Sequence, residues 1–189
     1  MKTKGKIFII FGVSGSGQDA VIKGLFKKGL RAIRMITTVT RGKRPGERNG
    51  RPYYFISEGR FREMIKKNKF IEWDEHYGAY YGCTYNELER VKKTGKIILW
   101  KTEMRGALAI KRKFPNVIVI MIKPPSIKVA LERLKKRGDG GQVVGRRLVE
   151  IKSYMRAAKN KKFDFVVTNK EGGLDETVER VKKIIEKNI

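Results

Sequence analysis

The sequence predicts an α/β fold built on a mostly parallel sheet flanked by helices. Short apolar segments recur along the chain, and segments with helical spacing of their apolar residues separate them. Continuous apolar runs of this kind are typical of strands buried on both faces. A glycine-rich turn joins the first of these strands to the first helix. With 189 residues, of which 40% are hydrophobic, the chain is expected to form one domain with a substantial core.

The predicted elements follow one another in a regular order. Residues 6–11 (KIFIIF) form the first strand, residues 12–17 the glycine turn, and the helix that follows ends at Gly29. Thr84 opens a further helix through a capping box with Glu87. Further strands are predicted at residues 97–100, 117–122 and 165–167, and further helices at residues 103–113, 126–136, 144–159 and 174–187.

Two stretches interrupt this order. Residues 40–83 mix turns with short alternating strands at 51–55 and 72–81, which predicts an inserted β-rich subdomain with Trp73 in its core. Residues 137–146 (RGDGGQVVGR) combine four glycines with flanking arginines. That composition favours a mobile flap over an anion.

Composition narrows the function classes further. The formal net charge of +26 makes polyanions the first partners to consider, although a lysine-rich composition gives the same charge without any partner. A single cysteine, Cys83, excludes an internal disulfide framework, and with the single His76 it excludes the usual zinc sites. No apolar run approaches the length of a membrane span or a signal segment, so we expect a cytoplasmic protein with no membrane partner.

The glycine turn partly matches a phosphate-binding P-loop. Such a loop has the pattern G-x-x-x-x-G-K-[ST] between a strand and a helix, and here residues 12–19 read GVSGSGQD. The glycine spacing lets successive backbone N–H groups and the helix N-terminus face an anion. However, Gln18 stands in place of the lysine and Asp19 in place of the hydroxyl that binds magnesium. Taken alone, the pattern suits a structural turn as well as a nucleotide site.

An ordered set of further motifs resembles the guanylate kinase family over roughly residues 5–187. No single motif is decisive, but their common order is highly specific. The matching segments are TTVTRGKRPGERNGRPYYF (37–55), FIEW (70–73), GAYYGC (78–83), EMRGA (103–107), PPS (124–126), RLKKRG (133–138), RRL (146–148) and VVTN (166–169).

This resemblance implies a P-loop NTPase-type α/β domain that transfers a phosphoryl group from ATP to GMP with Mg²⁺. It assigns residues 1–36, 84–136 and 147–189 to the core. It assigns residues 37–83 to an inserted GMP-binding subdomain and residues 137–146 to a lid. GMP and ATP are then the expected partners of the chain.

The resemblance also implies roles for individual residues. Glu72 and Glu103 match the carboxylates that read guanine, Glu103 being one methylene longer than the family's aspartate. Cys83 matches a serine or threonine that contacts the base, and its thiol is the poorer hydrogen-bonding group. The residues that match the cage around the GMP phosphate are Thr37, Arg41, Arg44, Tyr53 and Tyr81, whose guanidinium and hydroxyl groups suit phosphate oxygens.

On the ATP side, the resemblance implies two further groups. The lid arginines are Arg137, Arg146 and Arg147. They would neutralise the charge of the phosphoryl group in transfer and are therefore expected to be catalytic. The residues expected to contact ATP and its phosphates are Gly12, Ser14, Gly15, Ser16, Gly17, Gln18, Asp19, Arg133 and Asn169.

A third departure from the family pattern suggests an exchange of charge. Lys101 stands at the end of a core strand where the family has an aspartate near the metal and phosphates. Because the carboxyl ends of adjacent parallel strands face one crevice, Lys101 and the P-loop should view the same phosphates. We expect Lys101 to supply the catalytic charge that Gln18 lacks, and Asp19 to bind the magnesium.

Two alternatives remain open at this stage. Loss of one positioned charge costs about 3–4 kcal/mol of transition-state stabilisation, which would suit a non-catalytic nucleotide- or protein-binding module of the same family. Against that alternative, the cage and lid arginines are retained. A nucleic-acid-binding protein on this scaffold would account for the charge of +26, but the basic residues are spread evenly and form no recognised nucleic-acid-binding motif.

Overall fold

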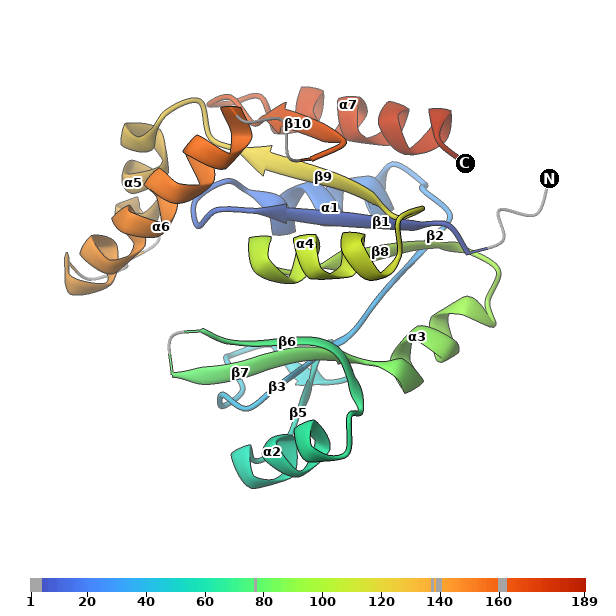
Figure 1. Cartoon of the computed structure of the whole chain (residues 1–189). Helices are drawn as coiled ribbons and strands as arrows, with labels where there is room; N and C mark the ends of the chain where they lie inside the picture. Colours follow the sequence, from blue (N-terminus) through green and yellow to red (C-terminus); the bar gives the residue numbers. More distant parts are fainter. Residues whose placement is uncertain (1–4, 77, 137, 139–140, 160–162) are drawn as a thin grey trace.

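The computed structural model describes residues 5–76, 78–136, 138, 141–159 and 163–189, with backbone alone at residues 141–144 and 146. Two five-stranded sheets organise these residues, and Figure 1 shows the second sheet below the first. The first sheet has the strand order β10-β9-β1-β8-β2, and all its neighbouring strands are parallel. Its strands are β1 (Ile7–Gly12), β2 (Ala32–Arg34), β8 (Ile97–Lys101), β9 (Ile118–Lys123) and β10 (Phe165–Thr168).

Helices cover both faces of this core sheet. Alternating side chains of the strands divide the core into two clusters, with Phe8 and Ile10 in one cluster and Ile9 and Phe11 in the other. The first cluster includes buried residues of α1 (Gln18–Lys27) and α7 (Leu174–Lys187). The second includes buried residues of α3 (Tyr85–Lys92), α4 (Met104–Lys113), α5 (Ile127–Lys136) and α6 (Gly141–Lys159). The α/β fold with a parallel sheet is therefore confirmed.

The second sheet is mixed and carries one helix of its own. Its strand order is β4-β5-β3-β7-β6, with the β3–β7 and β6–β7 pairs antiparallel. Phe61 of α2 (Glu58–Lys66) is buried against Phe70, with the two ring centroids 4.2 Å apart. The strands are β3 (Thr37–Val39), β4 (Arg48–Asn49), β5 (Pro52–Phe55), β6 (Phe70–His76) and β7 (Ala79–Thr84).

A buried carboxylate joins the second sheet to the core. Glu87 of α3 is 4% exposed and accepts a 2.8 Å hydrogen bond from the backbone N–H of Ile36, next to β3. Its two oxygens also accept from the guanidinium of Arg90 at 2.7 Å each. Half of the capping box that the sequence predicts is present: Thr84 accepts a hydrogen bond from the N–H of Glu87, whereas the Glu87 carboxylate bonds to Ile36 and Arg90. This network fixes the point at which the chain leaves the core.

The inserted region differs from the sequence prediction in three ways. The strand expected at residues 72–81 is a hairpin of β6 and β7. Helix α2 was not predicted, although Ser57 caps it by accepting a hydrogen bond from the N–H of Arg60. Trp73, expected in the core, is 46% exposed because it points away from the buried face of β6.

The predicted flap also differs from the structure. Helix α6 begins at Gly141, so residues 141–146 are helical, whereas the prediction began the helix at residue 144. No proline interrupts residues 141–146, so the helix can extend over Val143, Val144 and Gly145 despite their low helix propensity. Residues 137, 139 and 140 of the flap lie outside the described residues.

Candidate active site

The glycine loop between β1 and α1 has a backbone that only glycine accommodates well. Gly15 and Gly17 have φ values of 82° and 85°, in the left-handed region. A Cβ atom at Gly12 would collide with the carbonyl of Ile122 in the neighbouring strand. The loop therefore turns tightly enough to direct its N–H groups and the start of α1 toward one point.

Two side chains of the loop carry buried polar atoms with no hydrogen-bond partner among the described residues. These atoms are Oγ of Ser16 and Oε1 of Gln18. A buried polar atom without a partner costs free energy, so such atoms indicate a place where a ligand completes the bonding. An anion in the loop would accept a hydrogen bond from the Ser16 hydroxyl, whereas Oε1 of Gln18 is itself an acceptor and needs a donor.

Asn169 and Arg133, both expected to contact ATP, hold the loop's backbone carbonyl groups. Asn169 is 5% exposed, and its Nδ2 donates to the carbonyl of Ser16 at 2.9 Å. Arg133 on α5 donates to the carbonyl of Gly15 at 3.1 Å and to that of Asn169 at 3.0 Å. Their contacts keep the carbonyl groups turned away from the point where an anion would lie.

Asp19 lies between two cations at the carboxyl edge of the core sheet. Its Oδ2 is 2.7 Å from Nζ of Lys101, and its Oδ1 is 3.3 Å from Nη2 of Arg34. Burial alone would raise the pKa of Asp19, but the charges of Lys101 and Arg34 hold it below its usual value. Burial likewise opposes the charge of Lys101, yet Asp19 raises the pKa of that lysine. Asp19 and Lys101 are therefore both charged at neutral pH.

The structure thus brings Asp19 and Lys101 into contact, the two positions at which the sequence differs in charge from the family pattern. Arg34, the third member, was missed by the sequence analysis. Arg34 ends the short strand β2, and the strand order places β2 beside β8, which ends at Lys101. The sequence alone does not reveal this neighbourhood.

The donor groups of this region fit a magnesium ion at one residue. Mg²⁺ prefers carboxylate oxygens, and Asp19 supplies two of them beside the glycine loop. Its Oδ1 makes the longer of the two cation contacts, so this oxygen is the more available ligand.

A separate cluster of potential metal ligands is formed by His76, Glu103 and Glu150, whose ligand atoms lie within 4.8 Å of one another.

The second sheet gathers the residues expected around a phosphate. The guanidinium of Arg41 lies 5.0 Å from the ring centroid of Tyr53, and the rings of Tyr53 and Tyr81 are 6.4 Å apart. Glu47, which the sequence analysis did not single out, accepts two 2.7 Å hydrogen bonds from Arg41. It also accepts a 2.9 Å bond from the backbone N–H of Arg44, whose side chain is exposed. A phosphate bound here must share or replace Glu47 on Arg41.

Hydrogen bonding to Arg41 lowers the pKa of Glu47 to about 2, and the same bonding raises the pKa of Arg41. Both groups therefore remain charged over the physiological pH range. An incoming phosphate dianion can compete with Glu47 because it brings more negative charge to the same planar fork of donors.

Thr37 and Cys83 meet where β3 passes β7. Thr37 Oγ1 is 3.6 Å from Cys83 Sγ, and Cys83 is fully buried. Burial raises the pKa of the thiol well above its usual value, so Cys83 stays protonated. It therefore offers a weak, neutral hydrogen-bonding group at this position.

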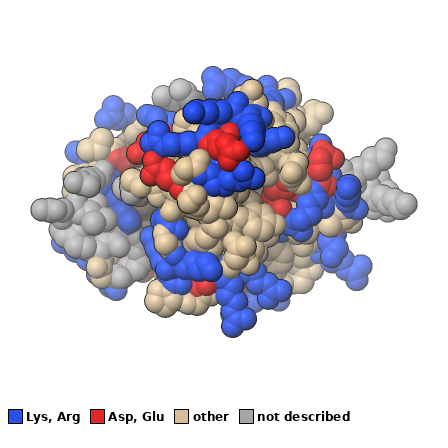
Figure 2. Space-filling model, turned by 90° about the horizontal axis from the view of Figure 1, so that it is seen from below, with Lys and Arg blue, Asp and Glu red and all other residues tan. Residues whose placement is uncertain are grey.

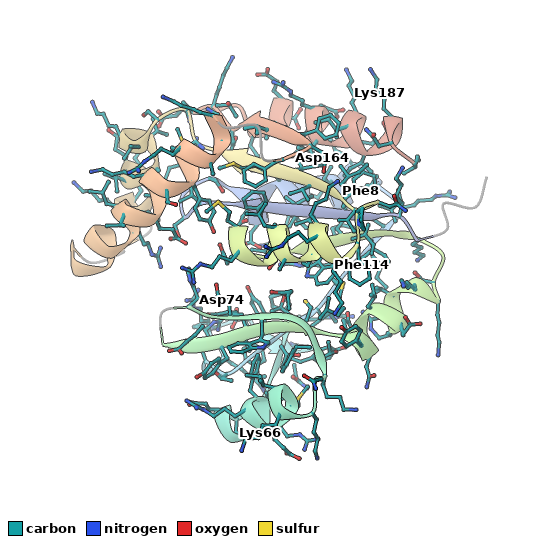
Figure 3. All side chains as sticks on the ribbon, viewed as in Figure 1. Phe8, Lys66, Asp74, Phe114, Asp164 and Lys187 are labelled. Atoms are coloured by element: carbon teal, nitrogen blue, oxygen red, sulfur yellow. The ribbon has the colours of Figure 1, made fainter. Side chains whose placement is uncertain are left out.

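Glu72 and Glu103 form an acidic pair where β6 faces the start of α4. Burial raises the pKa of Glu72 to about 7, helped by the nearby charge of Asp74, and burial also raises the pKa of Glu103. Glu103 accepts a 2.9 Å hydrogen bond from the hydroxyl of Tyr154 on α6. Figure 3 shows Asp74 on the side of β6 that is turned toward the core sheet. Since side chains alternate along a strand, Glu72 lies on this same side.

Gly106 makes room for this acidic pair. A Cβ atom at Gly106 would lie 2.7 Å from Oε2 of Glu72 and would also meet the hydroxyl of Thr102. Thr102 donates a hydrogen bond to Glu72, as does the backbone N–H of Cys83. The carboxylate is therefore held by polar neighbours but still lacks a full positive counter-charge.

The lid arginines are only partly described. Arg137 lies outside the described residues, as does the side chain of Arg146. Arg147 is partly buried on α6. Away from the site, lysine and arginine side chains are scattered over the face of the molecule seen in Figure 2 and do not form one continuous stripe.

Comparison with known proteins shows what the whole chain resembles. A family model described as "Guanylate kinase" matches residues 4–188. A guanylate kinase of Prochlorococcus marinus subsp. pastoris is 40% identical over 186 residues, covering 98% of this chain and 99% of the relative. One of Mycoplasma genitalium is 38% identical over 190 residues, covering 98% and 77%. The crystal structure of guanylate kinase from Anaplasma phagocytophilum matches with a TM-score of 0.73 and 24% identity, covering 96% of this chain and 85% of that one. Within the described residues, no helix has the length and apolarity needed to cross a membrane.

The raised pKa of Glu72 predicts a pH-dependent stability. Between pH 4.5 and about 7 the folded state keeps a proton on Glu72 that the unfolded state has released. The free energy of unfolding therefore falls as the pH rises through this window. We expect Glu72→Gln to be more stable than the wild type at pH 8 by about 2–3 kcal/mol and to flatten this slope, as measured by urea unfolding at pH 5 and pH 8. Glu75→Gln, at an exposed position on the same strand, is the control, and equal slopes for wild type and Glu72→Gln would contradict the prediction.

Proposed function

The chain belongs to the guanylate kinase family of nucleoside monophosphate kinases, and from this premise we propose that it transfers the terminal phosphoryl group of ATP to GMP, giving ADP and GDP. The observation that carries the proposal is the 2.7 Å contact between Lys101 and Asp19 beside the glycine loop. It supports the view that the cation lost at Gln18 is supplied from the neighbouring strand. An altered site of this kind can still stabilise a transferring phosphoryl group by charge and position alone.

We assign the acceptor, GMP, to the second sheet, so that residues 37–83 act as the GMP-binding subdomain. Arg41 and the hydroxyls of Tyr53 and Tyr81 would bind its phosphate, with Thr37 and Arg44 completing the cage. Glu72 and Glu103 would accept hydrogen bonds from the N1–H and N2–H₂ donors of guanine. These donors favour the ionised carboxylate, so binding of guanine would lower the pKa of Glu72 from about 7.

We assign the donor, ATP, to the glycine loop. Backbone N–H groups of residues 12–17, together with Ser16 and Gln18, would bind its phosphates, while Arg133 and Asn169 hold the loop in shape. Lys101 would lie against the group in transfer, and residues 137–146 would close over it as a lid with Arg137, Arg146 and Arg147. Asp19 would hold Mg²⁺, which neutralises phosphate charge when bound.

A second candidate is a non-catalytic nucleotide- or protein-binding module. The replacement of the P-loop lysine by Gln18 favours it, because an uncompensated loss of that charge would slow the reaction about 10²- to 10³-fold. In this module the acceptor site would bind GMP or a phosphorylated ligand without turnover.

A coupled assay of ADP release with GMP, ATP and magnesium separates the two candidates. We expect turnover with GMP and markedly less with AMP, which lacks the N2–H₂ group that Glu72 and Glu103 would read. GMP binding is measured in parallel by calorimetry. Absence of turnover at high enzyme concentration, with GMP still bound, would overturn the kinase proposal and leave the binding module.

The exchange of charge predicts that the effects of substitutions at residues 18, 19 and 101 on turnover depend on one another. Lys101→Asp should lower kcat about 10²- to 10³-fold, because it removes the cation beside the glycine loop and adds a like charge next to Asp19. Adding Gln18→Lys and Asp19→Ser to that variant restores the family arrangement and should recover most of the activity.

Steady-state kinetics of the single, double and triple variants measure this interdependence, with Lys96→Asp, at an exposed position before β8, as the control. A triple variant as slow as Lys101→Asp, or unchanged turnover in Lys101→Ala, would eliminate the exchange.

The buried thiol of Cys83 predicts that the acceptor site binds GMP less tightly than a site with a hydroxyl group at this position. Cys83→Ser replaces a poor hydrogen-bonding group with a good one beside Thr37, so we expect the KM for GMP to fall about 3- to 10-fold. Cys83→Ala provides the control, because it removes the thiol and adds no hydroxyl. Equal KM values for the serine and alanine variants would count against contact between residue 83 and the base.

A further inference from the structure

Arg34 is placed at the glycine loop by the strand order of the core sheet. It is the last residue of β2 and pairs in register with Leu99 of β8, two residues before Lys101. Because β1, β8 and β2 are neighbouring parallel strands, their carboxyl ends open on the same edge of the sheet. The side chain is mostly buried, with 22% of its surface exposed, and its Nη2 is 3.3 Å from Oδ1 of Asp19.

The charges at this edge do not cancel. Asp19 contributes one negative charge, and Lys101 and Arg34 contribute two positive charges. Within this group of three side chains one unit of positive charge remains, close to the positive end of α1, with Glu103 the further acidic group that acts on Lys101. The buried Ser16 hydroxyl, which lacks a partner among the described residues, lies in the same loop. The excess positive charge and the unused Ser16 hydroxyl, which can donate a hydrogen bond, together favour an anionic ligand.

The hydrogen bonding of Arg34 leaves most of its donors available. A guanidinium group has five N–H donors in a planar fork, and the one side-chain contact found for Arg34 among the described residues is that with Asp19. At 3.3 Å this contact is long for a charge-assisted bond, whereas the 2.7 Å contact of Lys101 is short. Lys101 is thus the main counter-ion of Asp19, and Arg34 can turn part of its fork toward another anion.

We propose that Arg34 is a second phosphate-binding cation of this site and binds the polyphosphate chain of a nucleoside triphosphate together with Lys101. The inference rests on the proposed function, since it requires that the triphosphate bind at the glycine loop. Asp19 then serves as a resident anion that keeps both cations extended toward the loop before the ligand arrives. A planar fork suits phosphate oxygens better than an ammonium group does, so Arg34 adds orientation as well as charge.

Binding of a non-hydrolysable ATP analogue, measured by calorimetry in EDTA and again with magnesium, tests the inference. We expect Arg34→Met to bind the analogue about 10- to 100-fold more weakly than the wild type in both conditions, with GMP binding unchanged. Arg34→Lys should recover part of the loss. Arg31→Met is the matched control, because it removes the same charge from an exposed position three residues earlier. Inorganic tripolyphosphate as a second probe should show the same order of affinities.

A second background separates phosphate binding from a purely structural role. In Asp19→Asn the ion pair with Arg34 no longer exists, so a structural Arg34 would have nothing left to stabilise. We expect Arg34→Met to weaken analogue binding in this background as well. Unchanged affinity there, or in the wild-type background, would overturn the inference while leaving the proposed function intact. Failure of the wild type itself to bind the analogue would overturn the proposed function, and this inference with it.

Discussion

The negative charge of Asp19 organises the carboxyl edge of the core sheet, because two mostly buried cations depend on it as their counter-ion. A mostly buried cation is unfavourable without a counter-charge, and the side chains of Lys101 and Arg34 are only 15% and 22% exposed, so both depend on Asp19. The strand register places Lys101 beside the loop, since Lys101 pairs directly with Ile10 of β1, two residues before the glycine loop begins. Neither Asp19 nor Lys101 can revert to the family residue alone without leaving an unpaired charge. In the site that we propose, the departures from the P-loop pattern are therefore one coupled change.

The shape of the loop depends little on the residue at position 18. Its backbone is set by the glycines at 15 and 17, by the close approach of Ile122 to Gly12, and by the side chains of Arg133 and Asn169 that bind its carbonyl groups. None of these contacts uses the side chain of residue 18. A loop that has lost its lysine can therefore keep the geometry of an anion-binding turn, and its strength then depends on the cations that the neighbouring strands supply.

Sequence patterns predict the elements of this chain whose apolar residues recur with a regular spacing over many positions. The continuous apolar runs of β1, β8 and β9 and the long helices that separate them were predictable because each buries a full face or stripe. The three-residue strands β2 and β3 carry no such signal, and their pairing is set by tertiary contacts. Arg34 was missed for the same reason, since its role follows from which strand lies beside β8. The Arg41–Glu47 pair was equally hidden, because the irregular segment of five residues between the two, 42–46, brings them together.

The two halves of the site have opposite electrostatic character. Cations outnumber the single Asp19 around Lys101 and Arg34, while Glu72 and Glu103 lie near each other where β6 meets α4 and have raised pKa values. A purely anionic ligand would be repelled by the acidic pair, and a purely cationic one by the arginines. A ligand with phosphate at one end and a hydrogen-bond-donating base at the other satisfies both halves at once. The net charge of +26 has no part in this selectivity, because it is spread over the surface, whereas the discrimination comes from a few buried groups whose charges are fixed by their neighbours.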